Sequence, residues 1–373
     1  MDMDFGGAYK GKTVFVTGHT GFQGSWLSEW LLLLGAHVVG YSIEPPTTPS
    51  HFSEIQLGER LAADIRGDVR SLETLQKQIS RHQPDFVFHL AAQPLVRRAF
   101  DEPHATAATN FMGSVNVLEA VRRESRRCVL IMITTDKVYE NAEWLHAYRE
   151  NDPLGGHDPY SASKACAEII ISAYRRSFFG VRRGAAAPAA AVASVRGGNV
   201  IGGGDWAEDR IVPDCVKSLA ARQTIRVRNS EATRPWQHVL ELLSGYLHLG
   251  SEISAAVQAQ NLERLEALCS SFNFGPEIAS NKTVGELVRE VLKHWPGDWR
   301  DIAEADARHE AGRLSLATDK AYHLLGWRPR WSFEEAIERT VEWYRGYYQA
   351  ESREAGFVKD LTRRQIIAYA EGL

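Results

Sequence analysis

The chain has 373 residues, of which 44% are hydrophobic and 24% are charged, a composition that excludes disordered and collagen-like proteins. Its length allows about two domains of roughly 150 residues each. Lysine and arginine number 43 against 47 acidic residues, a formal net charge of −4, which excludes nucleic acid as a main partner because no basic excess is available for a phosphate backbone.

The four cysteines, at positions 128, 166, 215 and 269, show neither CxxC spacing nor the density of a disulfide framework. We therefore expect free thiols in a reducing cytoplasm and no metal site. The N-terminal segment 1–4 is acidic, and the strongest apolar run, Leu31–Leu34, is far too short to span a membrane. The sequence thus predicts neither export nor membrane association.

Short apolar runs alternate with helix-length segments along the N-terminal half. Thr13–Val16 predicts a buried strand that leads directly into glycines. Trp26–Leu34 carries apolar residues at helical spacing, which predicts one apolar face, and Gly35 predicts the helix end. Further strands are expected at Ala36–Tyr41, Asp85–Leu90 and Cys128–Ile133. The alternation predicts an α/β fold with a doubly wound parallel sheet.

The C-terminal half is less regular. Arg182–Ala193 has low complexity and predicts a surface insertion before a strand at Val192–Val195. Beyond Gly204, short helices and turns rich in tryptophan and arginine indicate a smaller lobe shaped around a ligand. Phe272–Gly275 is expected to return one strand to the main sheet.

Three glycines, Gly18, Gly21 and Gly24, lie three residues apart between the first strand and the first helix. Backbone without Cβ lets a pyrophosphate approach the amide donors of a helix N-terminus, where the helix dipole also favours an anion. A tight turn alone would also account for such glycines. Their position at the first strand-to-helix junction favours a dinucleotide site.

The second strand ends at Ser42, where an acidic residue ordinarily binds the adenosine ribose of NAD, and Glu44 follows two residues later. No arginine or lysine lies in this stretch to bind a 2′-phosphate, which favours NAD over NADP. Asp68, in the turn Gly67–Arg70, is a candidate adenine ligand, with a purely structural turn residue as the alternative.

Tyr160 and Lys164 are four residues apart and share one face of a predicted helix. We expect the ammonium of Lys164 to favour ionisation of the Tyr160 phenol, whose reference pKa near 10 is too high for a base at neutral pH. The pair would then be a tuned proton acceptor. The alternative interpretation is an incidental surface pair.

Thr135, Asp136 and Lys137 directly follow the strand that ends at Ile133. Ligands of open parallel sheets bind outside the carboxyl ends of the strands, so these side chains are expected at the ligand crevice. Asp136 and Lys137 offer an acid and a base there. A helix cap beside a surface charge is the alternative.

In this order and spacing, the motifs resemble the extended short-chain dehydrogenase/reductase superfamily and, within it, the CDP-glucose 4,6-dehydratases. The resemblance runs from about residue 11 to residue 250 and rests on the segments TGHTGFQGSWLSEW, FHLAAQPLVRRAF, TTDKVYENAEW, YRENDPLGGHDPYSASKACAE, VRGGNVIGGGDWAEDRIVPD and RPWQHVLELLSGY, with GWRPRW near the C-terminus. It implies a Rossmann domain over residues 1–198, joined by about 236–280, that binds NAD. Residues 199–235 and 281–373 would form the substrate-binding lobe.

The resemblance also implies a reaction. Bound NAD would oxidise CDP-glucose at C4, water would be lost across C5 and C6, and hydride would return to C6, giving CDP-4-keto-6-deoxyglucose. A cytoplasmic homodimer serving deoxysugar biosynthesis for O-antigen lipopolysaccharide is implied as well. The alternatives are a nucleotide-sugar 4-epimerase, which has no need of an acid–base pair such as Asp136 and Lys137, and a non-catalytic NAD-binding sensor or scaffold.

Residue roles follow from the resemblance position by position. Tyr160 would take the C4 hydroxyl proton, Lys164 would hold the nicotinamide ribose, and Thr135 would hydrogen-bond the C4 oxygen. Asp136 would protonate the leaving C6 hydroxyl, and Lys137, where many related dehydratases carry glutamate, would take the C5 proton. The implied cofactor contacts are Gly18, Thr20, Gly21, Phe22, Gln23, Gly24, Asp68, Val69, Leu90, Ala91, Ala92, Tyr160 and Lys164.

Substrate contacts are expected from Gln93, Asn199, Arg210, Arg234 and His238. The arginines are candidates for the diphosphate because a planar guanidinium fork suits phosphate oxygens. Each arginine is equally interpretable as a member of a surface ion pair. Ser42, in place of the familiar ribose-binding aspartate, is the one departure from the family pattern that the sequence leaves unexplained.

Overall fold

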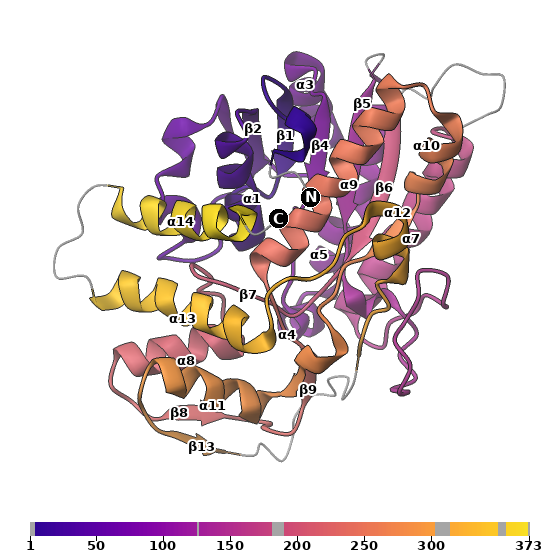
Figure 1. The fold of residues 1–373 in the computed structure, drawn as a ribbon. Coiled ribbons are helices and arrows are strands. Elements are labelled where there is room, and N and C mark those ends of the chain that lie inside the picture. Colours follow the sequence, from indigo (N-terminus) through magenta and orange to yellow (C-terminus); the bar gives the residue numbers. More distant parts are fainter. Residues whose placement is uncertain (1–3, 125–126, 181–189, 303–313, 350–355, 372–373) are drawn as a thin grey trace.

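The computed structural model describes residues 4–124, 127–180, 190–302, 314–349 and 356–371 (Figure 1). Its centre is a seven-stranded sheet in the order β11-β6-β5-β4-β1-β2-β3, and all neighbouring strands are parallel. The strands are β1 (Thr13–Thr17), β2 (His37–Ser42), β3 (Ala63–Arg66), β4 (Phe86–His89), β5 (Cys128–Ile133), β6 (Ala190–Arg196) and β11 (Ser271–Asn273). The predicted doubly wound α/β fold is confirmed.

Helices cover both faces of the sheet because successive strand residues point to opposite sides. In β1, Val14 and Val16 belong to one hydrophobic core and Phe15 to the other. The first core includes α1 (Phe22–Leu33) and α9 (Val239–Gln258); the second includes α3 (Leu72–His82), α6 (Gly113–Arg122) and α7 (Pro159–Ser177). Both faces are therefore dry, which explains the near-continuous apolar strands.

Short elements connect the layers in the first half of the chain. They are η1 (Phe5–Gly7), α2 (His51–Glu54), η2 (Leu57–Arg60), α4 (Val96–Asp101), α5 (Pro103–Ala107), the π-helical turn η3 (Ala108–Met112) and η4 (Asp136–Val138). The turn η4 directly follows β5, so the predicted catalytic residues lie at the carboxyl edge of the sheet, as expected.

The first helix differs from its prediction. We expected one apolar face on α1, but residues 24–31 are all buried, including Glu29 at 0% exposure. The reason is a second cover: α9 and the C-terminal helix α14 (Phe357–Glu371) both pack against α1. The Glu29 carboxylate is compensated there, since Arg363 of α14 donates to it at 2.6 Å and Arg60 donates as well.

A smaller lobe lies beside the sheet (Figure 1). In it, α8 (Ile211–Ala220) and α13 (Phe333–Gln349) contact α11 (Val284–His294), next to the parallel pair β8 (Ile225–Val227) and β13 (Trp299–Asp301). The remaining elements are β7 (Val200–Ile201), β9 (Thr233–Pro235), β10 (Gln237–His238), α10 (Leu262–Leu268), η5 (Ile278–Ser280), β12 (Asn281–Thr283) and α12 (Asp319–Leu325).

The C-terminal helices are shared between the two parts. α12 packs on β11 and α9, so it lies against the sheet although it follows the lobe in the chain, whereas α14 packs on both α1 and α13 and therefore joins the two parts. We keep the predicted division into a nucleotide-binding domain and a lobe as a proposal, and note that α12, which the prediction places in the lobe, contacts the sheet.

The remaining sequence predictions have mixed outcomes. Phe272 and Asn273 do return a strand, β11, to the main sheet. The predicted insertion at Arg182–Ala193 falls largely on residues 181–189, which lie outside the described residues, and Ala190–Ala193 already belong to β6. Among the helices that the structure describes, none combines the length and apolar character needed to cross a membrane.

Candidate active site

The glycine turn between β1 and α1 has no room for side chains. Gly18 has a φ of 77°, and a Cβ there would lie 2.7 Å from the backbone nitrogen of Ala91. A Cβ on Gly24 would lie 2.1 Å from the Gly18 carbonyl oxygen. Gly21, the N-cap of α1, offers no side chain to the first amides of the helix. The turn is thus a cradle whose backbone donors suit a pyrophosphate.

Neighbouring strand ends hold this turn in place. Thr20 Oγ1 lies 2.8 Å from Ser42 Oγ and donates to the Ile43 carbonyl at 3.1 Å, which ties the turn to the end of β2. On the other side, the Leu90 amide donates to the Thr17 carbonyl at 3.1 Å. The segment 90–92, predicted to contact the cofactor, therefore directly flanks the glycines.

The structure adds a basic group beside Ser42 that comes from outside the stretch Gly40–Glu44. Arg66 ends β3 and is in register with Ser42 on β2. Its guanidinium donates to Asp64 at 3.1 Å and to Glu44 at 3.2 Å. Local sequence could not reveal Arg66 because it comes from the next strand of the sheet. Asp64 and Glu44 both pair with the guanidinium charge of Arg66.

Other predicted cofactor residues, Asp68, Val69 and Gln23, make hydrogen bonds with the protein itself. Asp68 accepts from the amide of Arg70 at 2.9 Å and pairs with its guanidinium, whose hydrogen bond holds the pKa of Asp68 below its usual value. This geometry matches the alternative of a turn residue. The Val69 carbonyl accepts from Asn116 at 2.8 Å, and Gln23 accepts from the Tyr246 hydroxyl at 3.4 Å.

Phe22 begins α1 and is half-buried against the first core. It also faces the glycines that follow β7, where a Cβ on Gly202 would lie 3.1 Å from its ring.

Tyr160 and Lys164 lie on α7, which begins after Asp158, an N-cap that accepts from the Ser161 amide at 3.0 Å. Tyr160 is 8% exposed and Lys164 is 4% exposed. Lys164 Nζ donates to the Ile133 carbonyl at the end of β5, at 3.2 Å. The predicted pair is therefore buried beside the catalytic segment, and the alternative of an incidental surface pair is wrong.

Burial outweighs the effect that we expect Lys164 to have on Tyr160. Burial raises the pKa of the Tyr160 phenol to about 12, and the groups that oppose this are a hydrogen bond with Thr135 and the charge of Arg210. Burial also lowers the pKa of Lys164, to about 8. Desolvation, which the sequence does not reveal, outweighs the neighbouring charge at both residues.

Asp136 is the most confined of the predicted catalytic groups, at 1% exposure. It accepts from Thr135 Oγ1 at 3.0 Å and from Asn199 Nδ2 at 3.2 Å. Burial raises its pKa, although Lys137 and Arg234 oppose the shift. Asn199, which we expected at the substrate, contacts this carboxyl group.

A pocket of about 260 Å³ opens next to Asp136. Lys137, Asn199 and Arg234 line it together with Ser161 of α7. The lining holds two cationic side chains, Lys137 and Arg234, which suit a diphosphate, and two carboxylates, Glu143 and Asp158. The structure therefore brings together Lys137 and two of the predicted substrate residues.

Arg210 and Gln93 are engaged by the protein itself. Arg210 donates to Asp205 at 2.7 Å while its charge acts on Tyr160, so it is both a member of an ion pair and a neighbour of the site. The Gln93 amide donates to the Leu95 carbonyl at 3.1 Å, within the loop that follows β4.

His238 is corrected by the structure. It is fully buried, caps α9 by accepting from the Leu240 amide at 3.3 Å, and packs against Trp26 and Trp331. Burial lowers its pKa to about 3. The residues that bury it lie far away in the sequence, and it is a core side chain rather than a substrate contact.

Two residues of the site were missed. Asn110, in the π-helical turn η3, donates to the Gln93 carbonyl at 3.1 Å and to Ser163 Oγ at 2.9 Å, joining the loop after β4 to α7. π-Helical turns often mark functional sites, but the sequence carried no signal for one here. Glu168, four residues beyond Lys164, was detectable from its position on the same helix face.

Comparison with known proteins identifies the family. The family model of GDP-mannose 4,6 dehydratase matches residues 15–340. The chain belongs to this family. A CDP-glucose 4,6-dehydratase from Salmonella typhimurium is 45% identical over 351 residues, which cover 92% of this chain and 93% of that protein. The resemblance inferred from the motifs and the predicted enzyme class are confirmed.

Solved structures of family relatives share the fold. A dTDP-glucose 4,6-dehydratase from Streptomyces venezuelae, solved with NAD bound, superposes with a TM-score of 0.73 at 24% identity and covers 90% of this chain and 98% of its own. A UDP-glucuronic acid 4-epimerase from Bacillus cereus, in complex with UDP-glucuronic acid and NAD, gives 0.74 at 21% identity, with coverages of 90% and 100%. At these identities the likeness concerns the fold, which dehydratases and epimerases share.

Proposed function

We propose that the chain is an NAD-dependent CDP-glucose 4,6-dehydratase that forms CDP-4-keto-6-deoxyglucose and water. The observation that carries this proposal is the buried carboxyl of Asp136, whose burial raises its pKa and favours the protonated form, next to Lys137 at the pocket wall. An acid beside a base is what elimination requires and what an epimerase does not need. The relative at 45% identity supports CDP-glucose as the substrate.

The cofactor cradle fits NAD. Gly18, Gly21 and Gly24 leave the first amides of α1 open to a pyrophosphate, and Lys164, four residues after Tyr160 on α7, would hold the nicotinamide ribose. The guanidinium of Arg66 is held by Asp64 and Glu44, which supports NAD over NADP because a 2′-phosphate would have to displace a carboxylate. When bound, NAD supplies the hydride acceptor for C4, the hydride returned to C6 and a positive charge in the site.

The side chains of this chain divide the proton transfers between them. Tyr160, hydrogen-bonded with Thr135, takes the proton of the C4 hydroxyl. Lys137 takes the C5 proton, which the 4-ketone acidifies. Asp136 donates its proton to the departing C6 hydroxyl. Arg234, 9% exposed on β9 and lining the pocket, binds the diphosphate.

Incubation of the purified protein with CDP-glucose tests the proposal. We expect the alkaline absorbance of a 4-keto sugar to rise, and denatured protein to release NAD rather than NADP. Interconversion of sugar epimers with no keto product would favour the epimerase, and binding of NAD with no change in CDP-glucose would favour a sensor or scaffold.

We further propose a homodimer formed through the face that α7 and η3 share. These elements contact each other, and they expose Met112 at 45% and Ile169 at 56%. Exposed apolar side chains on adjoining elements suit an interface between copies. Sedimentation should give about twice the chain mass, and Ile169→Glu should shift the protein towards the monomer. A monomeric parent protein would contradict the proposal.

The cellular setting follows as part of the same proposal. None of the four cysteines forms a disulfide in the part of the chain that the structure describes, which supports a reducing cytoplasm. A 4-keto-6-deoxy sugar requires further enzymes that act on its ketone, which supports a place in deoxysugar biosynthesis. O-antigen lipopolysaccharide as the destination remains the prediction of the resemblance.

A further inference from the structure

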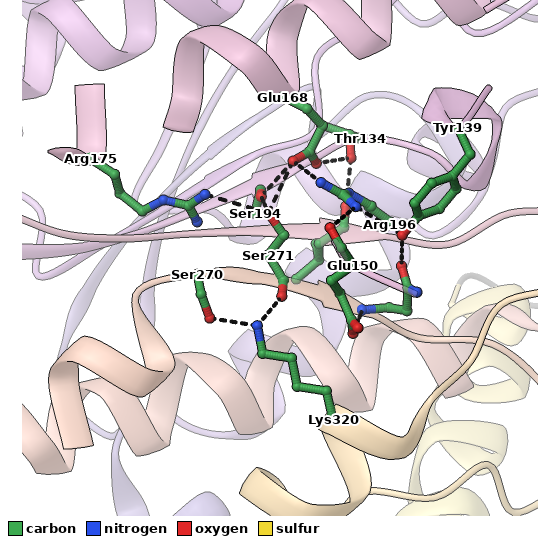
Figure 2. A network of polar contacts seen from close by, with 12 residues as sticks. Thr134, Tyr139, Glu150, Glu168, Arg175, Ser194, Arg196, Ser270, Ser271 and Lys320 are labelled. Atoms are coloured by element: carbon green, nitrogen blue, oxygen red, sulfur yellow. Dashed lines mark hydrogen bonds and ion pairs between the residues drawn. The ribbon is translucent and has the colours of Figure 1, made fainter. Parts of the chain in front are cut away.

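Figure 2 shows a network of polar contacts that includes Thr134 and Tyr139. At its centre is Glu168 of α7, which is 1% exposed. Its carboxylate accepts from Thr134 Oγ1 at 2.6 Å, from Ser194 Oγ at 2.9 Å, from Ser271 Oγ at 3.2 Å and from Arg196 Nη2 at 2.9 Å. These donors come from β6, from β11 and from the residue after β5. One carboxylate thus joins α7 to three neighbouring strands of the sheet.

Arg196 is the counter-charge of this carboxylate and is 3% exposed. Its Nη1 donates to the Tyr139 hydroxyl at 2.8 Å and to the Glu150 carbonyl at 3.0 Å, and the guanidinium stacks over the Tyr139 ring (Figure 2). Tyr139 in turn donates to Asn273 at 2.7 Å. Removing either member of a buried ion pair leaves the other charge uncompensated, so each depends on its partner.

The ion pair holds both ends of the segment 134–139, which contains Thr135, Asp136 and Lys137. Glu168 binds Thr134 at the start of the segment, and Arg196 binds Tyr139 at its end. The residue before Thr134 is Ile133, whose carbonyl receives the Lys164 ammonium. The network therefore fixes the backbone that carries Asp136 and Lys137. It also fixes the backbone carbonyl that binds Lys164.

The charge of the Glu168 carboxylate also affects the pKa of Lys164. Burial lowers the pKa of Lys164 to about 8, and the Glu168 carboxylate one helical turn away opposes this shift. Burial would raise the pKa of Glu168 itself, but the charge and hydrogen bond of Arg196 hold it below its usual value, so Glu168 stays ionised. The charge of Lys164 also acts on His89 of β4. Further titratable and charged groups lie on α7 itself (Tyr160 and Arg175) and on the elements η4 and β6 that contact α7 (Asp136, Lys137 and Arg196).

We propose that Glu168 and Arg196 are positioning residues of the reaction, whose ion pair fixes residues 134–139 and sets the charge that Lys164 experiences. The proposal rests on the role of Lys164 in the proposed function. Neither residue lines the pocket or reaches the reacting atoms. Because the two carry opposite charges at the same place, their removal must change the titration of Lys164 in opposite directions.

The direct test is competitive labelling of Lys164 with dilute acetic anhydride between pH 6 and 11, read by mass spectrometry on the full chain. Glu168→Gln keeps the shape of the side chain and should move the labelling midpoint of Lys164 down by about one pH unit, whereas Arg196→Met should move it up. The double variant should lie close to the parent. Exposed Lys77 on α3 is the internal control and should label alike in all variants.

Shifts of the same sign in both single variants, or no shift, would overturn the proposal and leave a purely structural network. Arg196→Lys keeps the charge and should leave the Lys164 midpoint unchanged, so it carries the test with Glu168→Gln if Arg196→Met does not fold. The labelling needs no substrate. A failure of the proposed reaction would therefore show as missing 4-keto product with the labelling shifts still present.

A kinetic readout completes the test. In a single turnover with CDP-glucose, the alkaline fall in the rate of formation of reduced nicotinamide should move in the same direction as the labelling midpoint of each variant. Thermal unfolding of the same proteins separates this effect from lost stability. Lower melting temperatures with an unchanged pH profile would also contradict the proposal.

Discussion

A single methyl group placed behind Asp136 should separate oxidation from elimination. Gly198 follows β6 and packs against the Asp136 side chain, and a Cβ there would lie 2.1, 2.2 and 2.4 Å from Oδ1, Cγ and Oδ2. Its φ lies outside the left-handed region that only glycine adopts freely, so alanine is compatible with the backbone. Gly198→Ala therefore acts on the carboxyl group and not on the local chain conformation.

The size of the effect follows from these distances. To regain ordinary van der Waals contact of 3.4 Å or more, the carboxyl of Asp136 must move by about 1.3 Å. A displacement of about 1 Å in a catalytic group costs on the order of 100-fold in rate, which corresponds to about 2.7 kcal/mol of activation free energy. Asp136 donates its proton only in the elimination, so oxidation at C4 should continue.

The assay is a single turnover with CDP-glucose, followed at the absorbance band of reduced nicotinamide and by product analysis. We expect the band to appear and persist while formation of the 6-deoxy product slows about 100-fold. Gly297→Ala is the matched control, because its Cβ would lie 2.3 Å from Leu219 Cδ2, at a comparable clash away from the pocket. It should lower stability without changing the ratio of the two steps. Normal turnover of Gly198→Ala would refute the assignment of Asp136 as the acid.

Three further outcomes are expected. Lys137→Met should let reduced cofactor accumulate because the C5 base is gone, whereas Tyr160→Phe should form little reduced cofactor. If the absorbance of reduced nicotinamide is lost equally in both variants, the separate roles of Lys137 and Tyr160 are contradicted. Arg234→Ala should raise KM by about 10- to 150-fold, the equivalent of about 1.5–3 kcal/mol for a charge-assisted contact, and an unchanged KM would remove Arg234 from the site. Burial lowers the pKa of His51 and His89 to about 3. Between pH 6.5 and 3 the unfolded chain therefore binds protons that the folded chain does not bind. Urea titrations should show that the free energy of unfolding falls as the pH falls through this window.

Local patterns predicted what depends on neighbours in the chain. Cys128–Ile133 was predicted to the residue as β5, because an uninterrupted apolar run is what a strand buried on both faces requires. The glycine turn and the position of Tyr160 and Lys164 on one helix followed for the same reason, since spacing along the chain decides them. The order of the parallel strands then placed η4 and α7 at one edge of the sheet.

What failed depends on partners that are distant in sequence. Arg66 is a strand neighbour of Ser42 because β3 pairs with β2, and His238 packs against Trp26 and Trp331, which are distant in sequence. The sequence predicted only one apolar face for α1. The helix α14, which packs on α1 in addition to α9, is more than 300 residues away in the chain and was therefore not considered. Burial of Tyr160 likewise arises from the assembled site, so its raised pKa had no counterpart in the tyrosine–lysine spacing.

The pKa shifts at the site have one physical cause and lead to one conclusion about the chemistry. Burial raises the pKa of Asp136 and of Tyr160 and lowers that of Lys164, so desolvation moves all three groups towards their neutral forms. A neutral Asp136 is the form that can protonate a leaving hydroxyl. A neutral Tyr160 is not yet a base, and its ionisation needs positive charge supplied from nearby. Arg210 already acts on it in this sense, and the charge of Glu168 opposes the loss of the Lys164 proton. The burial that keeps Asp136 protonated therefore also makes the ionisation of Tyr160 depend on cations that buried carboxylates hold in place.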